Sequence, residues 1–141
     1  IGAAIRELKE MAGERAEEID VMVLYTDDSI LQTDLDIERH RDMLGRIAEW
    51  KGDVMGFTVS IIHPVSWTLT PACYLEDLFV DPAARGQGIG GALIQDLVDI
   101  GRERGWSRLY WDTRASNDVA RRLYDKFVKA DDFVRYRMIL D

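Results

Sequence analysis

Residues 74–91 read Tyr-Leu-Glu-Asp-Leu-Phe-Val-Asp-Pro-Ala-Ala-Arg-Gly-Gln-Gly-Ile-Gly-Gly. In this stretch an apolar strand, a short turn and a glycine-rich helix start follow one another without interruption. Glycines remove side chains where backbone N–H groups converge on an anion, and a helix that begins there points the positive end of its dipole, about half a charge, at the same spot. The stretch therefore predicts a diphosphate site at Gly86, Gly88, Gly90 and Gly91.

Two phosphate-binding patterns fit these glycines. The first is the dinucleotide fingerprint G-x-G-x-x-G, which Gly86, Gly88 and Gly91 match, with Asp112 about twenty residues further on. In that fold the first glycine ends the strand directly, whereas residues 81–85 intervene here, and the 50 residues after Gly91 are too few for the remaining strands and helices. A Walker loop is excluded because no Gly-Lys-Ser or Gly-Lys-Thr occurs.

The second pattern is R-x-x-G-x-G, at Arg85, Gly88 and Gly90. Downstream, after the apolar run 109–113, a further motif reads N-x-x-A-x-x-L-Y, at Asn117, Ala120, Leu123 and Tyr124. Over residues 44–139 these motifs resemble the GCN5-related N-acetyltransferases. The stretch Tyr-Leu-Glu-Asp-Leu-Phe-Val is similar to the branch with spermidine/spermine and yeast histone, polyamine and D-amino-acid N-acetyltransferases.

The resemblance implies an α/β fold with a mixed, mostly antiparallel sheet, a splayed pair of parallel strands and flanking helices. At 141 residues and 47% apolar composition, the chain fits one domain, residues 1–141. The first strand usual in this superfamily is not visible in the sequence, and the chain begins with Ile1 rather than Met.

Periodicity and turn signals predict the elements in order. Residues 1–19 have the pattern of an amphipathic helix, and residues 21–25 fit either a strand or a helix end within the unassigned stretch 20–42. The remaining predictions are strands 45–50 and 54–62 around a Lys51-Gly52-Asp53 turn, a loop 63–71, strand 72–80, helix 88–104, a parallel strand 108–113, helix 117–127 and a closing strand 133–140. In the helix 88–104, an apolar stripe is expected at Ile89, Leu93, Leu97 and Ile100. The family's usual Gly-Phe after the Leu-Tyr pair is absent, and the longer link resembles the yeast-type branch.

The resemblance implies acetyl-CoA as the cosubstrate. Backbone N–H groups at Leu78, Phe79 and Val80 are expected to hold the thioester carbonyl and the developing oxyanion. The other expected cofactor-binding residues are Arg85, Gly86, Gln87, Gly88, Ile89, Gly90, Gly91, Asn117, Ala120 and Tyr124. For the 3′-phosphate, Arg121, Arg122 and Lys126 are candidates, although each fits a solvated surface charge equally well.

Acetyl transfer to an amine needs a neutral nitrogen, and amines with a pKa of about 10 are almost wholly protonated at neutral pH, so a base is required. The resemblance implies that Glu76 is this base; the alternative is a surface carboxylate paired with Arg. Strand alternation groups Glu76 with Tyr74, Leu78 and Val80 on one face, and Asp77 with Leu75 and Phe79 on the other. The sequence leaves open which face meets the acceptor.

Tyr124 is the candidate acid that protonates the departing thiolate, a role that the resemblance implies. The alternative is a core aromatic, because Ala120, Leu123 and Phe127 share its apolar face. Asn117 also suits the N-cap of the helix.

The composition of the chain indicates what kinds of partner and location to expect. Residues 1–60 hold 14 Asp and Glu against seven Lys and Arg, and this half contributes most of the net charge of −8. Such a charge favours a cationic acceptor or serves solubility, and it disfavours nucleic acid. No apolar run long enough for a membrane span and no charged-then-apolar leader occur, so a cytoplasmic protein is expected.

Cys73 is the one cysteine and is expected to be a buried structural thiol. Two histidines, His40 and His63, are too few for a metal site, and no metal is expected. Trp67 and His63 are candidates for walls of an acceptor pocket, against loop anchoring for Trp67 and solvent exposure for His63.

The sequence therefore predicts an acetyl-CoA-dependent N-acetyltransferase. The acceptor is expected to be a primary amine of a small molecule, polyamine-like or amino-acid-like, or of a peptide, which attacks directly in a ternary complex. The alternative is a catalytically inactive acyl-CoA-binding protein of the same fold. A homodimer is left open.

Overall fold

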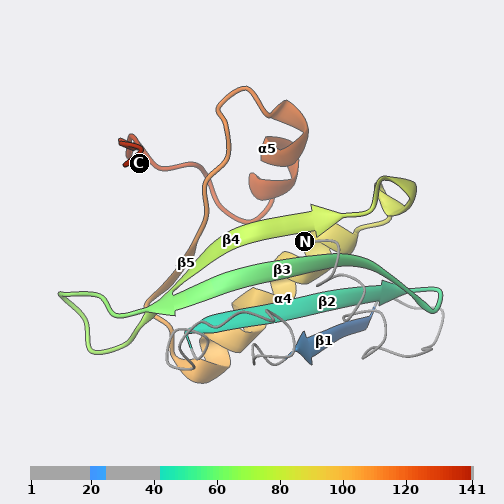
Figure 1. Ribbon diagram of the computed structural model, residues 1–141, viewed down its shortest axis with the longest axis horizontal. Coiled ribbons are helices and arrows are strands. Elements are labelled where there is room, and N and C mark those ends of the chain that lie inside the picture. Colours follow the sequence, from blue (N-terminus) through green and yellow to red (C-terminus); the bar gives the residue numbers. More distant parts are fainter. Residues whose placement is uncertain (1–19, 25–41, 141) are drawn as a thin grey trace.

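The computed structural model describes residues 20–24 and 42–140, which form one mixed sheet and its covering helices (Figure 1). Five strands lie in the order β1-β2-β3-β4-β5. The first four pair antiparallel, and β4 pairs parallel with β5, as predicted for the fold class. The strands are β1 Asp20–Leu24, β2 Met43–Trp50, β3 Asp53–His63, β4 Ala72–Val80 and β5 Arg108–Tyr110.

The helical elements are the short 3-10 helix η1 Pro82–Ala84 and the α-helices α4 Ile89–Arg104 and α5 Asp118–Tyr124. The strand reading of residues 21–25 is confirmed by β1. The predicted helix 1–19 lies outside the described residues, as do residues 25–41. Within the described ranges no helix has the length and apolar character needed to cross a bilayer.

The hairpin between β2 and β3 forms at the predicted turn. Lys51 and Gly52 both have a positive φ, of 54° and 83°. This combination is typical of the two-residue turn whose twist matches antiparallel strands. It sets the pairing of Trp50 with Asp53.

Helix α4 supplies a large part of the core. Its buried stripe consists of Ile89, Leu93, Ile94, Leu97 and Ile100, and this includes all four predicted positions. The stripe packs against Leu44, Ala48 and Leu75 on one face of the sheet and against Ala84 of η1. Arg46 on β2 adds a polar tie, because its Nε donates to Asp96 Oδ2 on α4 at 2.6 Å.

Strand β4 carries a β-bulge that the sequence analysis did not predict. In the β3–β4 register, Val59 pairs with Asp77 and Ser60 pairs with Leu75, so that Glu76 is skipped. A bulge places one extra residue in one strand and shifts the alternation of its side chains.

The predicted faces of β4 are wrong for this reason. Leu75 is buried in the cluster under α4, and Leu78, three residues later, contacts the same cluster. Val80 also packs on the α4 side. Leu78 and Val80 therefore lie on the face opposite Tyr74, and Leu75 lies on the face opposite Phe79.

The parallel pair is shorter than predicted. It extends only from Ala72 to Tyr74 on β4, opposite β5. From Trp111 onward the chain leaves the sheet, so the prediction of a strand to residue 113 is wrong at its end. The remainder of β4 has no partner from β5, which is the splay that the family resemblance implied (Figure 1).

The predicted closing strand 133–140 is wrong, because the structure has no regular element there. Its apolar side chains are largely exposed: Phe133, Val134, Tyr136, Met138, Ile139 and Leu140. A strand needs a neighbouring edge to bond its backbone, and the adjacent strand, β5, ends at Tyr110.

Candidate functional site

The loop between β4 and α4 has the geometry that the glycine pattern predicted. Asp81 Oδ1 accepts a hydrogen bond from the Ala83 N–H at 2.9 Å and fixes the start of η1. Arg85 Nε donates to the Val80 carbonyl at 3.2 Å. Gly86 and Gly88 both have a left-handed backbone, with φ of 84° and 83°. A Cβ atom at either glycine would meet nothing within 4 Å, so the loop is open on that side.

Helix α4 begins directly after this loop. Gly88 is its N-cap and provides no side-chain capping bond. The first N–H groups of a helix have no intrahelical acceptor, and here no side chain of the cap satisfies one. Ile89 is 1% exposed and packs into the core, so only its backbone is available to a ligand. Arg85 and Gln87 are exposed beside the open loop.

Gly90 and Gly91 have a different role from Gly86 and Gly88. A Cβ atom on Gly90 would lie 3.0 Å from Leu123 Cδ2, and one on Gly91 would lie 3.7 Å from Leu123 Cδ1. Gly90 therefore lets α5 approach α4 closely, whereas a methyl group at Gly91 would make an ordinary contact. The two sequence motifs meet at this contact.

On α5, Asn117 is the N-cap, as predicted, since its Oδ1 accepts from the Ala120 N–H at 3.3 Å. Its Nδ2 donates to Thr113 Oγ1 at 3.3 Å. Tyr124 is half-buried, and its ring lies 5.5 Å from the Trp111 ring in an edge-to-face arrangement. Burial raises the pKa of Tyr124, so its hydroxyl keeps its proton at neutral pH, as an acid requires.

The two carboxylates of β4 are both exposed, at and after the bulge. Burial raises the pKa of the Tyr74 hydroxyl, as does its hydrogen bond to Asp112, and Glu76 adds a smaller electrostatic contribution in the same direction. Glu76 therefore lies near enough to Tyr74 to affect its titration, and it stands at the bulge of β4. Asp77 pairs opposite Val59, on the face of Phe79.

Side chains that sequence reasoning had not grouped meet beside Glu76. Tyr74 Oη donates to Asp112 Oδ2 at 2.9 Å, and the Tyr74 and Tyr110 rings lie 5.0 Å apart. His63 Nδ1 lies 2.8 Å from the Pro64 carbonyl, and its Nε2 lies 2.6 Å from Tyr110 Oη. The predicted parallel pairing of residues 72–80 with 108–113 could have indicated this group, but the sequence does not give the register of the two strands.

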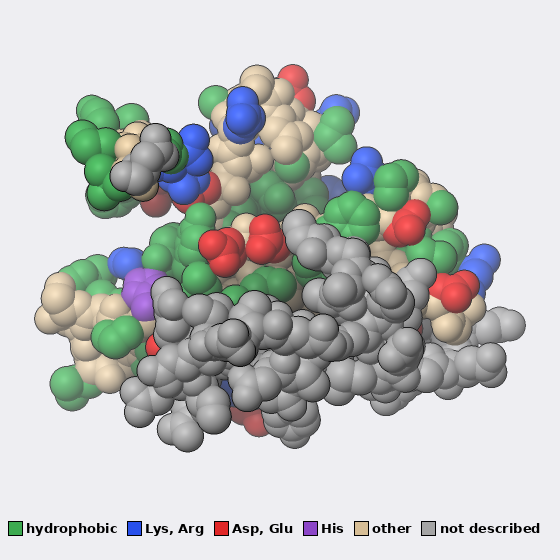
Figure 2. Space-filling model, in the orientation of Figure 1, with side chains coloured by type: hydrophobic (Ala, Val, Ile, Leu, Met, Phe, Trp, Pro, Cys, Tyr) green, Lys and Arg blue, Asp and Glu red, His purple; other side chains and the backbone are tan. Residues whose placement is uncertain are grey.

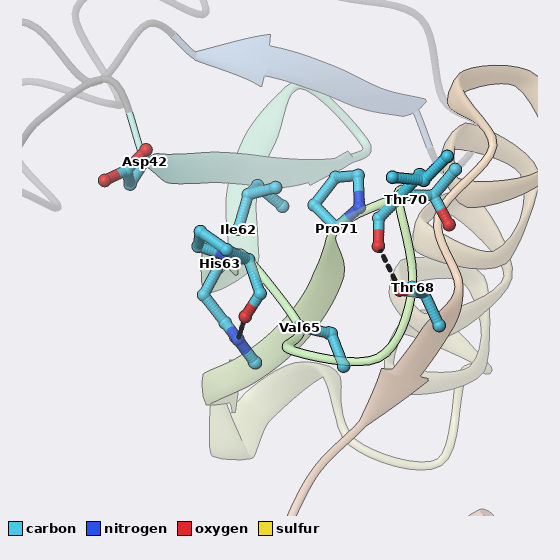
Figure 3. A pocket seen from close by; sticks show the side chains of 9 residues that line it. Asp42, Ile62, His63, Val65, Thr68, Thr70 and Pro71 are labelled. Carbon is cyan, nitrogen blue, oxygen red and sulfur yellow. Dashed lines mark hydrogen bonds between the residues drawn. The ribbon is translucent and has the colours of Figure 1, made fainter.

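A cavity of about 360 Å³ lies next to this group, at the loop between β3 and β4 (Figure 3). His63 is one of its lining residues. Trp67 is not one of them; it is 73% exposed, with the Arg108 guanidinium 5.7 Å from its ring. The cavity is lined by Asp42, Ile62, His63, Pro64, Val65, Thr68, Leu69, Thr70 and Pro71.

The three candidates for a 3′-phosphate lie on or after α5. Arg121 Nη1 donates to the Ala115 carbonyl at 2.9 Å, and Arg122 Nε donates to the Asp118 carbonyl at 3.4 Å. Lys126 is exposed. Backbone oxygens already engage both guanidinium groups, which is consistent with their alternative reading as surface charges.

Cys73 is fully buried, as predicted. Burial raises its pKa to about 11, an effect that the neighbouring Ser60 hydroxyl partly offsets. A thiol in this state is not a nucleophile at neutral pH. Nor does the described part of the chain gather three or more His, Cys, Asp and Glu side chains that could hold a metal ion.

A sequence model of the acetyltransferase (GNAT) family matches residues 4–128. The D-amino-acid N-acetyltransferase HPA3 of Saccharomyces cerevisiae is 35% identical over 86 residues, which cover 61% of this chain and 53% of that protein. The N-acetyltransferase YhfO of Bacillus subtilis is 34% identical over 102 residues, covering 71% and 68%. The chain thus spans about half the length of the first of these relatives.

Solved structures of acetyltransferases have the same fold as this chain. A ribosomal-protein-alanine N-acetyltransferase from Brucella melitensis is 25% identical, with a TM-score of 0.70 over 86% of this chain and 99% of that one. An AAC(6')-Iy structure, in complex with a CoA-containing bisubstrate analogue, is 20% identical, with a TM-score of 0.64 over 87% and 99%.

Proposed function

The chain belongs to the acetyltransferase (GNAT) family, and we propose that it is an acetyl-CoA-dependent N-acetyltransferase that acts on a primary amine. The proposal rests on one arrangement. The open glycine loop at the start of α4 follows the end of β4, whose stretch beyond Tyr74 has no β5 partner; Glu76 lies on this stretch, and Tyr124 packs against the core cluster under α4.

The cofactor would bind along this splay. The backbone N–H groups after Gly86 and Gly88 suit a diphosphate, because they are unpaired at a helix N-terminus and the loop is open. The edge of β4 beyond Tyr74 lacks a β5 partner, which leaves main-chain groups for the amide-bearing arm of CoA. The backbone of Leu78 to Val80 would hold the thioester carbonyl.

The chemistry then needs three proton transfers. Glu76 takes a proton from the bound ammonium, directly or through a water, and the neutral nitrogen attacks the thioester carbonyl in a ternary complex. The C–N bond forms, the C–S bond breaks, and Tyr124 donates its proton to the departing sulfur. The nitrogen then loses its second proton, which returns to Tyr124 directly or through water. Burial raises the pKa of Tyr124, so its hydroxyl is protonated at neutral pH and is a weaker acid than a free phenol.

The acceptor is proposed to be a small amine, polyamine-like or amino-acid-like, or a peptide amine. The names of the relatives include both a D-amino-acid and a ribosomal-protein-alanine acetyltransferase, so they support an amine acceptor without choosing its class. The acidic balance of residues 1–60 favours a cationic acceptor.

The test is release of free CoA thiol from acetyl-CoA with polyamines, lysine analogues, D-amino acids and aminoglycosides. Amine-dependent thiol release, with acetylated product by mass spectrometry, is expected for at least one class. If acetyl-CoA raises the melting temperature but no amine causes thiol release, the chain is a CoA-binding protein without this activity.

A further inference from the structure

A carboxylate and a phenol meet on the face of the sheet opposite α4, close to Glu76. Because Leu75 packs under α4, the adjacent Tyr74 lies on the other face. Its hydroxyl donates to Asp112 at 2.9 Å. Asp112 follows β5 at the point where the parallel strands separate, so its side chain lies at the rim of the splay. Figure 2 shows acidic side chains in the middle of this face, with hydrophobic side chains around them.

This pair already holds a cation in the free protein. Arg135, from the irregular segment 133–140, places Nη1 3.3 Å from Asp112 Oδ2. Among residues 42–140, that segment is joined to the rest of the protein by this ion pair and by a local hydrogen bond from the Phe133 N–H to Asp131 Oδ1. Both side chains are largely solvent-exposed, at 59% for Arg135 and 43% for Asp112. Exposed pairs of this kind contribute little to stability, so another cation can replace the guanidinium.

A second cation nearby is already engaged elsewhere. The Arg108 guanidinium lies 4.8 Å from the Tyr110 ring and 5.7 Å from the Trp67 ring, and it makes no ion pair with Asp112. The replaceable charge at Asp112 is therefore that of Arg135.

We propose that Asp112 and Tyr74 form a subsite for a second positive charge of the acceptor, and that Arg135 occupies this subsite until the acceptor binds. The inference rests on the proposed function and narrows it to acceptors with two cationic groups. Glu76, at the bulge, is two residues from Tyr74 along β4, and Tyr74 holds Asp112 through its hydroxyl group. The proposed acceptor is therefore a short alkyl diamine with one nitrogen at Glu76 and the other nitrogen at Asp112.

The experiment compares 1,4-diaminobutane with 1-aminobutane, which has the same length and one charge fewer. Wild-type protein is expected to prefer the diamine. Asp112→Asn keeps an acceptor for the Tyr74 hydroxyl and removes the charge, so the ratio of kcat/KM for diamine over monoamine should fall about tenfold, mainly through KM. Arg135→Gln should lower KM for the diamine, because it removes the competitor.

A matched control is Asp99→Asn, which removes one exposed carboxylate on α4 and should leave the ratio unchanged. An equal loss for both amines in Asp112→Asn, or no preference for the diamine in wild-type protein, would overturn the inference while acetyl transfer itself stands.

Should no amine cause thiol release, the proposed function fails separately, and the subsite is then tested by binding. Calorimetric titration of 1,4-diaminobutane into wild-type protein and Asp112→Asn, both with CoA present, is expected to show weaker binding to the variant. Equal affinity for the two proteins would refute the subsite.

Discussion

Helix α4 provides a matched pair of positions for testing the phosphate loop, because the glycines at its two ends have nearly the same backbone conformation. Gly88 is the N-cap with φ 83°, and Gly105 is the C-cap with φ 74°. A Cβ atom at either position would meet nothing within 4 Å. An alanine side chain at either position therefore makes no clash. It lowers stability only because a left-handed backbone is unfavourable for a residue with a Cβ atom. We expect Gly88→Ala and Gly105→Ala to lose similar stability, roughly 1–2 kcal/mol.

The two variants should differ in CoA binding. Gly105 lies at the far end of the 16-residue helix, roughly 24 Å from Gly88. At Gly88 the new methyl group takes up space that the diphosphate needs in order to reach the backbone N–H groups. A lost hydrogen bond to a charged group is worth about 1.5–3 kcal/mol, so the Kd for CoA should rise by about 10-fold to 10²-fold in Gly88→Ala.

The assay is calorimetric titration with CoA, together with melting temperatures measured with and without CoA. Each variant alone should melt roughly 3–8 °C below wild type. Saturating CoA should raise the melting temperature of Gly105→Ala as much as that of wild type, and that of Gly88→Ala less. If Gly88→Ala binds CoA as tightly as Gly105→Ala does, the loop does not hold the diphosphate and the reasoning fails.

Three further predictions concern single side chains. Glu76→Gln should lower kcat/KM by about 10²-fold and leave the Kd for CoA unchanged. The loss of activity should become smaller at high pH, because the amine then loses its proton without a base. If Asp77→Asn shows this loss instead, the base is misassigned. Tyr124→Phe keeps the ring against Trp111, so melting should change little while turnover falls about 10-fold to 10³-fold. The pKa of Cys73 is near 9 in the unfolded chain and about 11 in the folded protein. The protonated thiol therefore stabilises the fold below pH 9, and this contribution is lost as the pH rises toward 11. The free energy of unfolding of Cys73→Ala, measured by chemical denaturation, should depend less on pH in the alkaline range than that of wild type.

Much of the fold could be predicted from local signals. The run 72–80 is β4, and the predicted stripe of α4 is buried. Lys51 and Gly52 form the expected turn. Each of these depends on neighbours within a few residues, where glycine conformation and apolar periodicity decide the structure.

The two faces of β4 could not be predicted, because strict alternation assumes a strand without a bulge. The extra residue at Glu76 moves Leu78 and Val80 to the α4 side. No residue in the stretch Leu-Glu-Asp-Leu marks a bulge, which arises from the pairing with β3. The bulge affects the candidate site, because both Glu76 and Asp77 are exposed where the alternation of side chains is interrupted.

The end of the chain was overpredicted for a related reason. The apolar alternation of residues 133–140 suits a strand, but strand formation depends on a neighbouring edge, and β5 ends at Tyr110. Pattern alone does not supply that partner. The same departure of the chain from the sheet places Asp112 at the rim, where Arg135 reaches it.

The two motifs that indicated the family are separate in sequence, yet the structure gives them one physical basis. Gly90 belongs to the phosphate motif, but its lack of a side chain is needed by Leu123, whose Cδ2 would lie 3.0 Å from a Cβ there. Leu123 immediately precedes Tyr124, so the position of the candidate acid depends on a glycine of the helix that begins at the phosphate loop. The spacing within R-x-x-G-x-G therefore has two consequences: in the proposed site Gly88 leaves the loop open for the diphosphate, and Gly90 lets α5 approach α4, so that Tyr124 packs against the core cluster.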